Sequence, residues 1–385
     1  MHLDRRSFLG TTALLAAPRL LLAQAATERR LIFIIQRGAA DGLNTVIPYA
    51  DPAYAAARGN QAIDPASTHK LDGLFALHPS LAKLHTLYGA GQASFFHAVA
   101  SPYRDRSHFD GQNVLETGGN APYQVKDGWL NRLLGLLPRT GKDAMAFSSA
   151  IPLALRGPVE VSSYAPSALP AANDDLMMRV EQLYAKDRQL HALWASALEA
   201  RGMAGGAAGG MSGNAPRQDS AALGRMAAGF LGRADGPRVA MIETSGWDTH
   251  SGQTARLAAQ LGNLDNLLAG LHDGLGAVWD KTVILVATEF GRTVAANGTG
   301  GTDHGTGAVA MLVGGAVQGG RVVADWPGLS NANLLDGRDL KPTLALDALI
   351  TEVCAQSFAI EPERLSQVLF PHGGRGTPIP RLLRA

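Results

Sequence analysis

The sequence is short of several features that would each point to a particular class of protein. Cys354 is its only cysteine among 385 residues, which excludes an internal disulfide and a cysteine-based metal cage. No apolar run approaches the roughly eighteen residues of a membrane-spanning helix, so stable membrane insertion is not expected. With 17% charged residues, a net charge of +1 and no basic block, nucleic acid is not expected as a partner either. The 46% of apolar residues still suffices for a large core.

The first 25 residues have the layout of an export signal. Arg5-Arg6 is followed by Ser7-Phe8-Leu9, by a modestly apolar stretch over 11–22 and by Ala23-Gln24-Ala25, a small-residue cleavage site. The arginine pair with its Phe-Leu resembles the twin-arginine pattern. We therefore expect residues 1–25 to be a signal peptide whose partner is the twin-arginine export machinery. The mature protein would be periplasmic or secreted, with a net charge of −1.

Apolar runs and leucine spacings predict the fold. Five short runs rich in β-branched and aromatic residues are typical of buried strands; they cover 31–35, 93–99, 238–242, 282–287 and 308–313. Apolar residues three and four positions apart predict amphipathic helices; these cover 253–278, about 174–200 and about 343–358. Strands separated by helices indicate a three-layer α/β sandwich with a mainly parallel central sheet. We expect one such domain over 26–385, with a flexible glycine-rich loop at 201–217.

Ligands of parallel α/β sheets bind beyond the carboxyl ends of the strands, so the polar residues there are the first candidates. Three predicted strands are followed by such residues, and a glycine-rich loop precedes a fourth strand. The candidates at these places are Arg37 and Asp41, Glu243, Asp248 and His250, Glu289 and Arg292, and Asp303 and His304. If the strands are placed correctly, carboxylates and imidazoles concentrate at one edge of the sheet.

Aspartate and histidine without a thiolate suit a divalent metal bound through oxygen and nitrogen, such as Zn²⁺, Mn²⁺, Mg²⁺ or Ca²⁺. Asp248 and His250 flank one residue, so both can point to the same side of an extended segment. Each motif is weak alone, because an aspartate also caps helices and Glu289 can pair with Arg292. Their coincidence at one sheet edge is what favours a metal site.

Ser107 is the candidate nucleophile. It lies in a segment that follows the strand at 93–99, and a helix that begins there would place its hydroxyl at the positive helix end, where free N–H groups bind oxyanions. A metal ion can lower the pKa of such a hydroxyl. The alternative is that Ser107 only caps the helix.

Six segments of the chain together resemble a bacterial exported family called domain of unknown function 1501, within the alkaline phosphatase-like superfamily. The resemblance covers nearly the whole mature chain and rests on Arg37-Gly38 with Asp41-Gly42-Leu43-Asn44, Leu77-His78-Pro79, Ser107 to Gln112, Gly246 to His250, Thr288 to Thr293 and Thr302 to Gly305. It implies an alkaline phosphatase-like fold. The family itself brings no settled activity.

The superfamily resemblance implies roles for particular residues. It implies Asp41, Asp248, His250 and His304 as metal ligands, Ser107 as nucleophile, and Glu243 as a further ligand because it stands five residues before Asp248. The usual Asp-His-Gly is replaced by Glu289-Phe290-Gly291, which keeps a carboxylate and loses an imidazole, so one metal position is expected to be weakened or empty. His108 and Asp303 are expected either as replacement ligands or as residues that orient ligands.

The sequence thus predicts an exported metal-dependent hydrolase or transferase that acts on a phosphate or sulfate ester in an anionic small molecule or polymer. The residues that would hold the metal are Asp41, Asp248, His250, Glu289 and His304. Arg37 or Arg292 would bind the anionic group. The alternative is a non-catalytic periplasmic binding protein that keeps the fold and a remnant metal site, which the phenylalanine at 290 favours. Convergence of the ligand atoms on a common point would favour the enzyme.

Overall fold

The structure is a computed structural model of the chain. It describes residues 28–138, 143–165, 174–185, 187, 189–191, 194–195, 197–198, 219–373, 379 and 381–384. The predicted signal peptide over 1–25 and the predicted glycine-rich loop over 201–217 lie outside these residues, so both stay predictions. None of the described helices is both long and apolar enough to cross a membrane.

The described α-helices alternate with strands along much of the chain. The helices are α2 (Gly42–Thr45), α3 (Tyr54–Arg58), α4 (Ala82–Gly89), α5 (His108–Thr117), α6 (Trp129–Leu136), α7 (Asp174–Tyr184), α9 (Ser220–Leu231), α10 (Gln253–Leu275), α11 (Leu346–Phe358) and α12 (Pro362–Leu369). The strands are β1 (Arg30–Arg37), β2 (Val46–Ile47), β3 (His69–Lys70), β4 (Ala76–Leu77), β5 (Ala93–Ala100), β6 (Ala144–Phe147), β7 (Ser162–Ser163), β8 (Val239–Ser245), β9 (Thr282–Ala287), β10 (Ala308–Val313), β11 (Arg321–Val323) and β12 (Leu344–Ala345).

A nine-stranded sheet forms the centre of the molecule. Its order is β11-β5-β10-β9-β1-β8-β6-β7, with β12 also paired to β5. β10 is antiparallel to both of its neighbours, and the other pairs in this sheet are parallel. The carboxyl ends of β1, β5, β8 and β9 therefore meet the start of β10 at one edge. The strands β2, β4 and β3 form a separate three-stranded sheet in the order β2-β4-β3.

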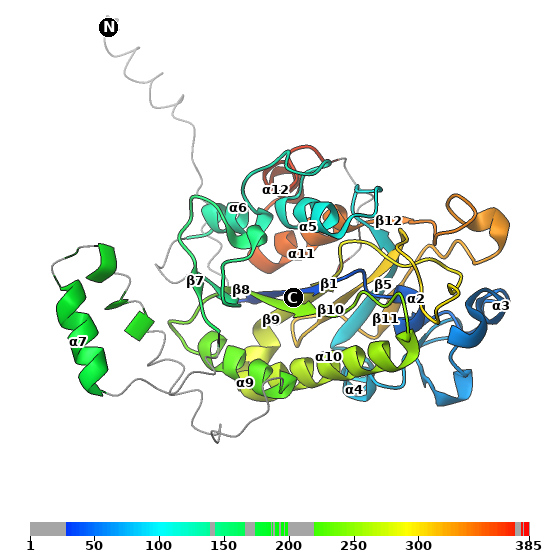
Figure 1. Cartoon of the computed structure of the whole chain (residues 1–385), viewed down its shortest axis with the longest axis horizontal. Coiled ribbons are helices and arrows are strands. Elements are labelled where there is room, and N and C mark those ends of the chain that lie inside the picture. Colours follow the sequence, from blue (N-terminus) through cyan, green and yellow to red (C-terminus); the bar gives the residue numbers. More distant parts are fainter. Residues whose placement is uncertain are drawn as a thin grey trace, which may run out of the picture.

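Helices cover both faces of the central sheet, which gives the predicted three layers (Figure 1). Side chains of a strand alternate between faces, and β1 shows why both faces are buried. Leu31, Phe33 and Ile35 pack on the side of α6, α11 and α12, while Ile32 and Ile34 pack on the side of α4, α9 and α10. A continuous apolar run is what a strand buried on both faces requires.

The predicted strands and the long helix are confirmed. β9 and β10 have the predicted bounds, and β1, β5 and β8 differ from them by one to three residues at an end. α10 begins at the predicted Gln253 and gives way at Gly276, which has φ +52°, to a 3-10 turn. The antiparallel direction of β10 was not predicted, since an apolar run carries no sign of its direction.

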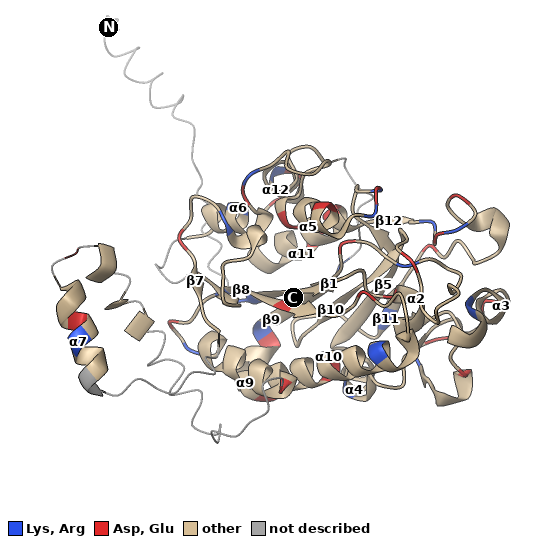
Figure 2. Ribbon diagram, viewed as in Figure 1, with Lys and Arg blue, Asp and Glu red and all other residues tan. Residues whose placement is uncertain are grey.

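On the ribbon in Figure 2, acidic and basic residues are interspersed.

Candidate metal centre

Three loop segments and one helix meet at the edge where the strands end. Asp248 and His250 follow β8, Glu289 follows β9, and α5 follows β5. Asp303 and His304 precede β10, and they reach the same edge because β10 runs opposite to β9. The topology therefore assembles residues from four distant parts of the sequence.

The imidazole cluster, as we name Asp248 with His108, His250 and His304, is the centre of this edge. Asp248 Oδ1 lies 3.1 Å from His250 Nε2 and 3.5 Å from His304 Nε2, and Asp248 Oδ2 lies 3.6 Å from His108 Nε2. The Nε2 atoms of His250 and His304 are 2.9 Å apart. One ligand atom each from His108, Asp248 and His304 all lie within 4.8 Å of one another. The Nε2 atoms of three imidazoles thus face the Asp248 carboxylate, although His250 lies outside the group that His108, Asp248 and His304 form.

The Nδ1 atom of each imidazole faces an oxygen that can only accept. His108 Nδ1 lies 2.8 Å from Glu289 Oε1, His250 Nδ1 lies 3.1 Å from Asp303 Oδ1, and His304 Nδ1 lies 2.8 Å from the carbonyl oxygen of Arg106. Ionised carboxylates and carbonyls accept hydrogen bonds, so each Nδ1 carries the proton. In the neutral rings the Nε2 lone pairs then point inward.

This arrangement fits a divalent cation. Two Nε2 atoms at 2.9 Å cannot both carry a hydrogen, and two lone pairs repel at that distance unless a proton or a metal ion lies between them. His108 Nε2 is buried and has no hydrogen-bond partner in the described part of the chain. Metal-binding histidines characteristically donate Nδ1–H to a carboxylate or backbone carbonyl, which orients the ring and makes Nε2 more basic. The donors present therefore suit a nitrogen-preferring ion such as Zn²⁺ or Mn²⁺.

Hydrogen bonds and an ion pair keep the carboxylates of Glu289 and Asp248 charged. Burial opposes ionisation of Glu289, but hydrogen bonds from His108, from Gln112 Nε2 at 3.0 Å and from the Gly38 N–H at 2.8 Å outweigh it and lower the pKa of Glu289. Burial of Asp248 is likewise outweighed by Arg292, so its pKa is lowered. The hydrogen bond to Glu289 raises the pKa of His108, and burial lowers the pKa of His304.

Ser107 stands between two residues that contact the cluster. Arg106 supplies the carbonyl that holds His304, and His108 is a member of the cluster. Ser107 is the N-cap residue of α5, as predicted, yet its side chain makes no capping hydrogen bond. Its backbone N–H donates to Tyr103 Oη at 3.0 Å, and Arg106 has φ +60°. Strained backbone persists where the surroundings enforce it, and here it presents Ser107 beside the cluster.

Arg292 holds Asp248 from a fully buried position. Its Nη1 donates to Asp248 Oδ1 at 2.7 Å and its Nε to Thr302 Oγ1 at 3.1 Å, while Nη2 donates to the carbonyl of Thr302. These donors are occupied within the protein, so Arg292 serves to fix the position of Asp248. The contact of Arg292 with an anionic group stays a prediction.

Arg37 and Glu243 lie behind the cluster. Arg37 forms ion pairs with Glu243 and Glu116, the latter at 2.8 Å, and donates to Gln112 Oε1 at 2.8 Å. Gln112 in turn donates to Glu289. Both residues are therefore linked to the cluster through Gln112. Glu243, predicted as a ligand, has Arg37 as its partner and is not among the grouped ligand atoms.

Asp41 lies apart from the imidazole cluster. It is buried, pairs with the buried guanidinium of Arg58, accepts from Gln253 Nε2 and caps α2 by accepting from the Asn44 N–H at 3.2 Å. All of these interactions are internal, so the structure gives the predicted metal ligand a structural role. Arg58 and Gln253 stood in no recognisable motif, and their part in this site was missed.

Phe290 packs against two imidazoles of the cluster. Its ring stacks on that of His108 at 5.1 Å between centroids and lies 5.3 Å from that of His304. Gly111 allows this packing, because a Cβ there would lie 3.0 Å from the Phe290 ring. An apolar ring at this position leaves the cluster with the ligands for one ion.

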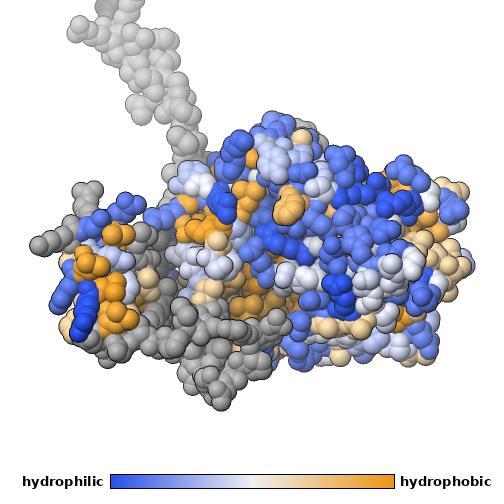
Figure 3. Space-filling model, viewed as in Figure 1, coloured by the Kyte–Doolittle hydropathy of each residue, from blue (hydrophilic) through white to orange (hydrophobic). Residues whose placement is uncertain are grey.

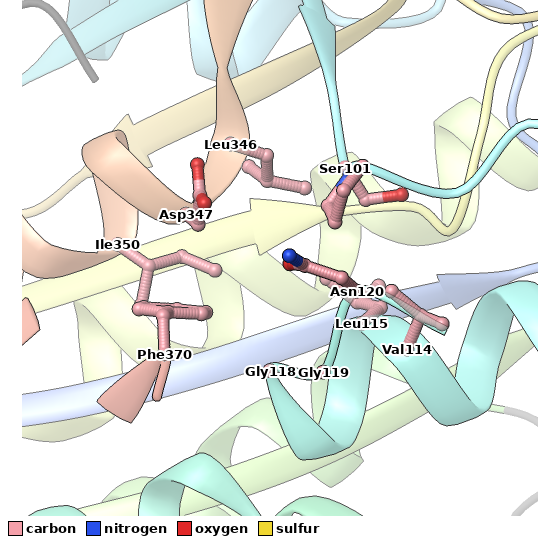
Figure 4. Close-up of a pocket in the computed structure, with 11 residues that line it drawn as sticks. Ser101, Val114, Leu115, Gly118, Gly119, Asn120, Leu346, Asp347, Ile350 and Phe370 are labelled. Carbon is pink, nitrogen blue, oxygen red and sulfur yellow. The ribbon is translucent and has the colours of Figure 1, made fainter. Parts of the chain in front are cut away.

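A small pocket also lies along the C-terminal half of α5 (Figure 4). Apolar side chains dominate its lining, with Leu115, Leu346, Ile350 and Phe370 beside Asp347 and Asn120. Burial raises the pKa of Asp347. None of the cluster residues lines this pocket, so it is not the chemical centre.

A family model described as Protein of unknown function (DUF1501) matches residues 28–369. No curated protein matches the sequence. Among solved structures, the chain is similar to the lipoteichoic acid synthase LtaP from Listeria monocytogenes, with 11% identity, a TM-score of 0.36 and coverage of 70% of this chain and 57% of that one. It thus spans little more than half of that chain.

Two further solved structures are similar at the same level. The phosphonate monoester hydrolase of Agrobacterium radiobacter has 12% identity, a TM-score of 0.35 and coverage of 77% and 70%. The alkaline phosphatase from the Antarctic bacterium TAB5 has 10% identity, a TM-score of 0.34 and coverage of 75% and 92%. These identities and TM-scores are too low to transfer a function. The chemistry of the cluster is therefore inferred from its own side chains.

Proposed function

The chain belongs to the family described as Protein of unknown function (DUF1501), and we propose that it is a metal-dependent hydrolase or transferase of phosphate or sulfate esters. The observation that carries the proposal is the convergence of three Nε2 atoms on Asp248, each ring held by an acceptor at Nδ1. Asp248, His108, His250 and His304 would hold one divalent ion. When bound, the ion supplies positive charge that stabilises an anionic transition state.

Ser107 would act as the nucleophile. Its Oγ bonds to the phosphorus or sulfur and releases its proton to solvent, while the bond to the alcohol oxygen breaks and the alcohol leaves with a proton from water. Water, or a second alcohol in a transferase, then takes the group from Ser107. The positive end of α5, at whose start Ser107 stands, favours the negative charge of the transferred group.

A metal titration combined with an ester assay tests the proposal. Wild-type protein is expected to bind one equivalent of Zn²⁺ or Mn²⁺ and to hydrolyse phosphate or sulfate esters in a panel. Asp248→Asn should lose both metal binding and ester hydrolysis. Ser107→Ala should still bind the metal, but its kcat should fall by about 10³-fold or more. Asp273→Asn is the matched control, since Asp273 pairs with His272 at 3.0 Å on the exposed face of α10. Absence of metal binding in the wild type would refute the proposal.

A binding protein without turnover is the second candidate. It is favoured by Arg292, which already neutralises Asp248 through a 2.7 Å ion pair and thereby weakens its charge toward a metal. This candidate predicts that the wild type and Ser107→Ala bind metal and anionic esters with equal affinity and that neither turns them over.

Export by the twin-arginine machinery to the periplasm or exterior is also part of our proposal. It is supported by Arg5-Arg6 with Phe8-Leu9 and by Ala23-Gln24-Ala25. Replacement of both arginines by lysine should leave the unprocessed protein in the cytoplasm, as cell fractionation would show. Processing and export of the double variant at the wild-type rate would contradict it.

A further inference from the structure

Two aromatic side chains stand exposed at the first turn of α5, beside the imidazole cluster. Phe109 is 83% exposed and Tyr123 is 58% exposed. In the space-filling view a small apolar spot lies at the position of α5, surrounded by hydrophilic surface (Figure 3). Contact between the apolar Phe109 ring and water is unfavourable in free energy. A ligand that covers the ring would recover that free energy.

Tyr123 is held in this place by specific contacts. Its N–H donates to Asn113 Oδ1 at 2.7 Å, and a hydrogen bond with Asp110 raises the pKa of its phenol. Its backbone has φ +61°, a conformation that costs about 1–2 kcal/mol for a residue with a side chain. Such strain clusters at functional sites. The ring is thus fixed above α5 at an energetic cost that the fold itself does not explain.

The helix geometry puts these rings at the rim of the cluster. His108 and Gln112, four residues apart, share the face of α5 that contacts Glu289. Phe109 and Asn113 form the next stripe, and Asn113 holds Tyr123. Phe109 directly follows a cluster residue in the chain, so an ester bound at Ser107 would extend its alcohol part across this stripe.

We propose that Phe109, Tyr123 and Asp110 form a subsite for a sugar ring, so that the substrates are phosphate or sulfate esters of carbohydrates; this rests on the proposed function. A pyranose has a C–H face that packs on an aromatic ring and hydroxyl groups around its edge. Asp110 follows Phe109 in the chain and hydrogen-bonds with Tyr123, and its carboxylate can accept hydrogen bonds from hydroxyl groups. Two rings in a hydrophilic surface are far too small for a protein interface, which buries about 800 Å² on each partner.

Paired esters test the subsite. Glucose 6-sulfate and glucose 6-phosphate are compared with n-butyl sulfate and n-butyl phosphate in the metal-loaded wild type, Phe109→Ala and Tyr123→Ala. We expect each variant to lower kcat/KM for the sugar esters about tenfold through KM, the scale of one aromatic contact. The butyl esters should change by less than about twofold, and Phe109→Trp should restore the sugar ester values. Leu183→Ala is the control, because Leu183 is 75% exposed on α7, which projects away from the sheet (Figure 1).

Binding of neutral cellotriose, followed by saturation-transfer NMR, separates failure of the subsite from failure of the proposed function. The wild type and Leu183→Ala should bind it, and Phe109→Ala should not. If the wild type hydrolyses none of the four esters but this binding pattern holds, the function fails and the subsite stands. Absence of cellotriose binding in the wild type, or equal binding by Phe109→Ala, overturns the subsite.

Discussion

Asp248 and Asp41 follow neighbouring strands at the same sheet edge, yet they sit in opposite surroundings. Asp248 is 44% exposed and faces three inward-pointing Nε2 atoms. Asp41 is buried, with its oxygens taken by Arg58, Gln253 and the Asn44 N–H. An aspartate at a strand end is therefore not a metal ligand by position. Whether such an aspartate can bind a metal depends on whether neighbouring groups already occupy the lone pairs of its oxygens.

The histidines repeat this contrast. His97 lies in the region of Asp41, fully buried, with Nε2 donating to the Val46 carbonyl at 2.9 Å and Nδ1 accepting from the Ala98 N–H at 2.9 Å. Backbone groups satisfy both of its nitrogens. His250 has one nitrogen held by Asp303 and the other directed at Asp248. The polar groups around Asp41 are satisfied within the protein, whereas the inward-facing nitrogens of the imidazole cluster are satisfied only when a ligand binds.

The largest expected effect comes from breaking the buried pair. Arg58→Met leaves Asp41 charged and unpaired in the interior and should lower the free energy of unfolding by about 3–5 kcal/mol. Chemical denaturation measures the loss. The folded variant should bind metal like the wild type, and a large loss of metal affinity would show that the two regions are one site.

Acid should destabilise the region of Asp41 through His97. Burial lowers the pKa of His97 from 6.5 to about 4, so the unfolded state binds the extra proton first. Stability is thus lost as the pH falls from about 6.5 to about 4, by up to about 3 kcal/mol. Thermal unfolding across this range should show the loss in the wild type and a smaller one in His97→Gln. Parallel curves for the two proteins would contradict this assignment.

In the cluster, removal of an orienting group should affect the metal and spare the fold. Asp303→Ala frees the His250 ring and should weaken metal affinity about 10–100-fold. The metal-free variant should unfold like the wild type, since Asp303 is exposed. Isothermal titration gives the affinity, and Asp336→Ala, which removes another exposed acid, is the control. Unchanged affinity would mean that His250 is not a ligand.

The smallest expected effect is a gain in stability at the rim. Tyr123→Gly relieves the positive φ and should raise the free energy of unfolding by about 1 kcal/mol or less, since glycine gives back part of the gain as chain entropy. Metal affinity should stay the same. A loss of stability would show that the Tyr123 ring supports the fold.

Much of the architecture could be predicted because it depends on local patterns. Runs such as 282–287 are apolar on both faces, and the leucine stripe of α10 marks one helix face. The N-cap position of Ser107 follows from the polar residue before the helix. The membership of His108 in the cluster was predicted only as one of two alternatives, because the residues it meets lie far away in the sequence.

Residue types and their order determined that an α/β sheet would gather carboxylates and imidazoles at one edge, since strand burial and side-chain chemistry are properties of short segments. Only the tertiary structure decided which of them bear free lone pairs. That depends on groups distant in the chain, such as Arg58 at Asp41 and Arg292 at Asp248. The reversed direction of β10 brings His304 to Asp248, because hydrogen bonds and charges act over a few ångströms in space whatever the separation in sequence.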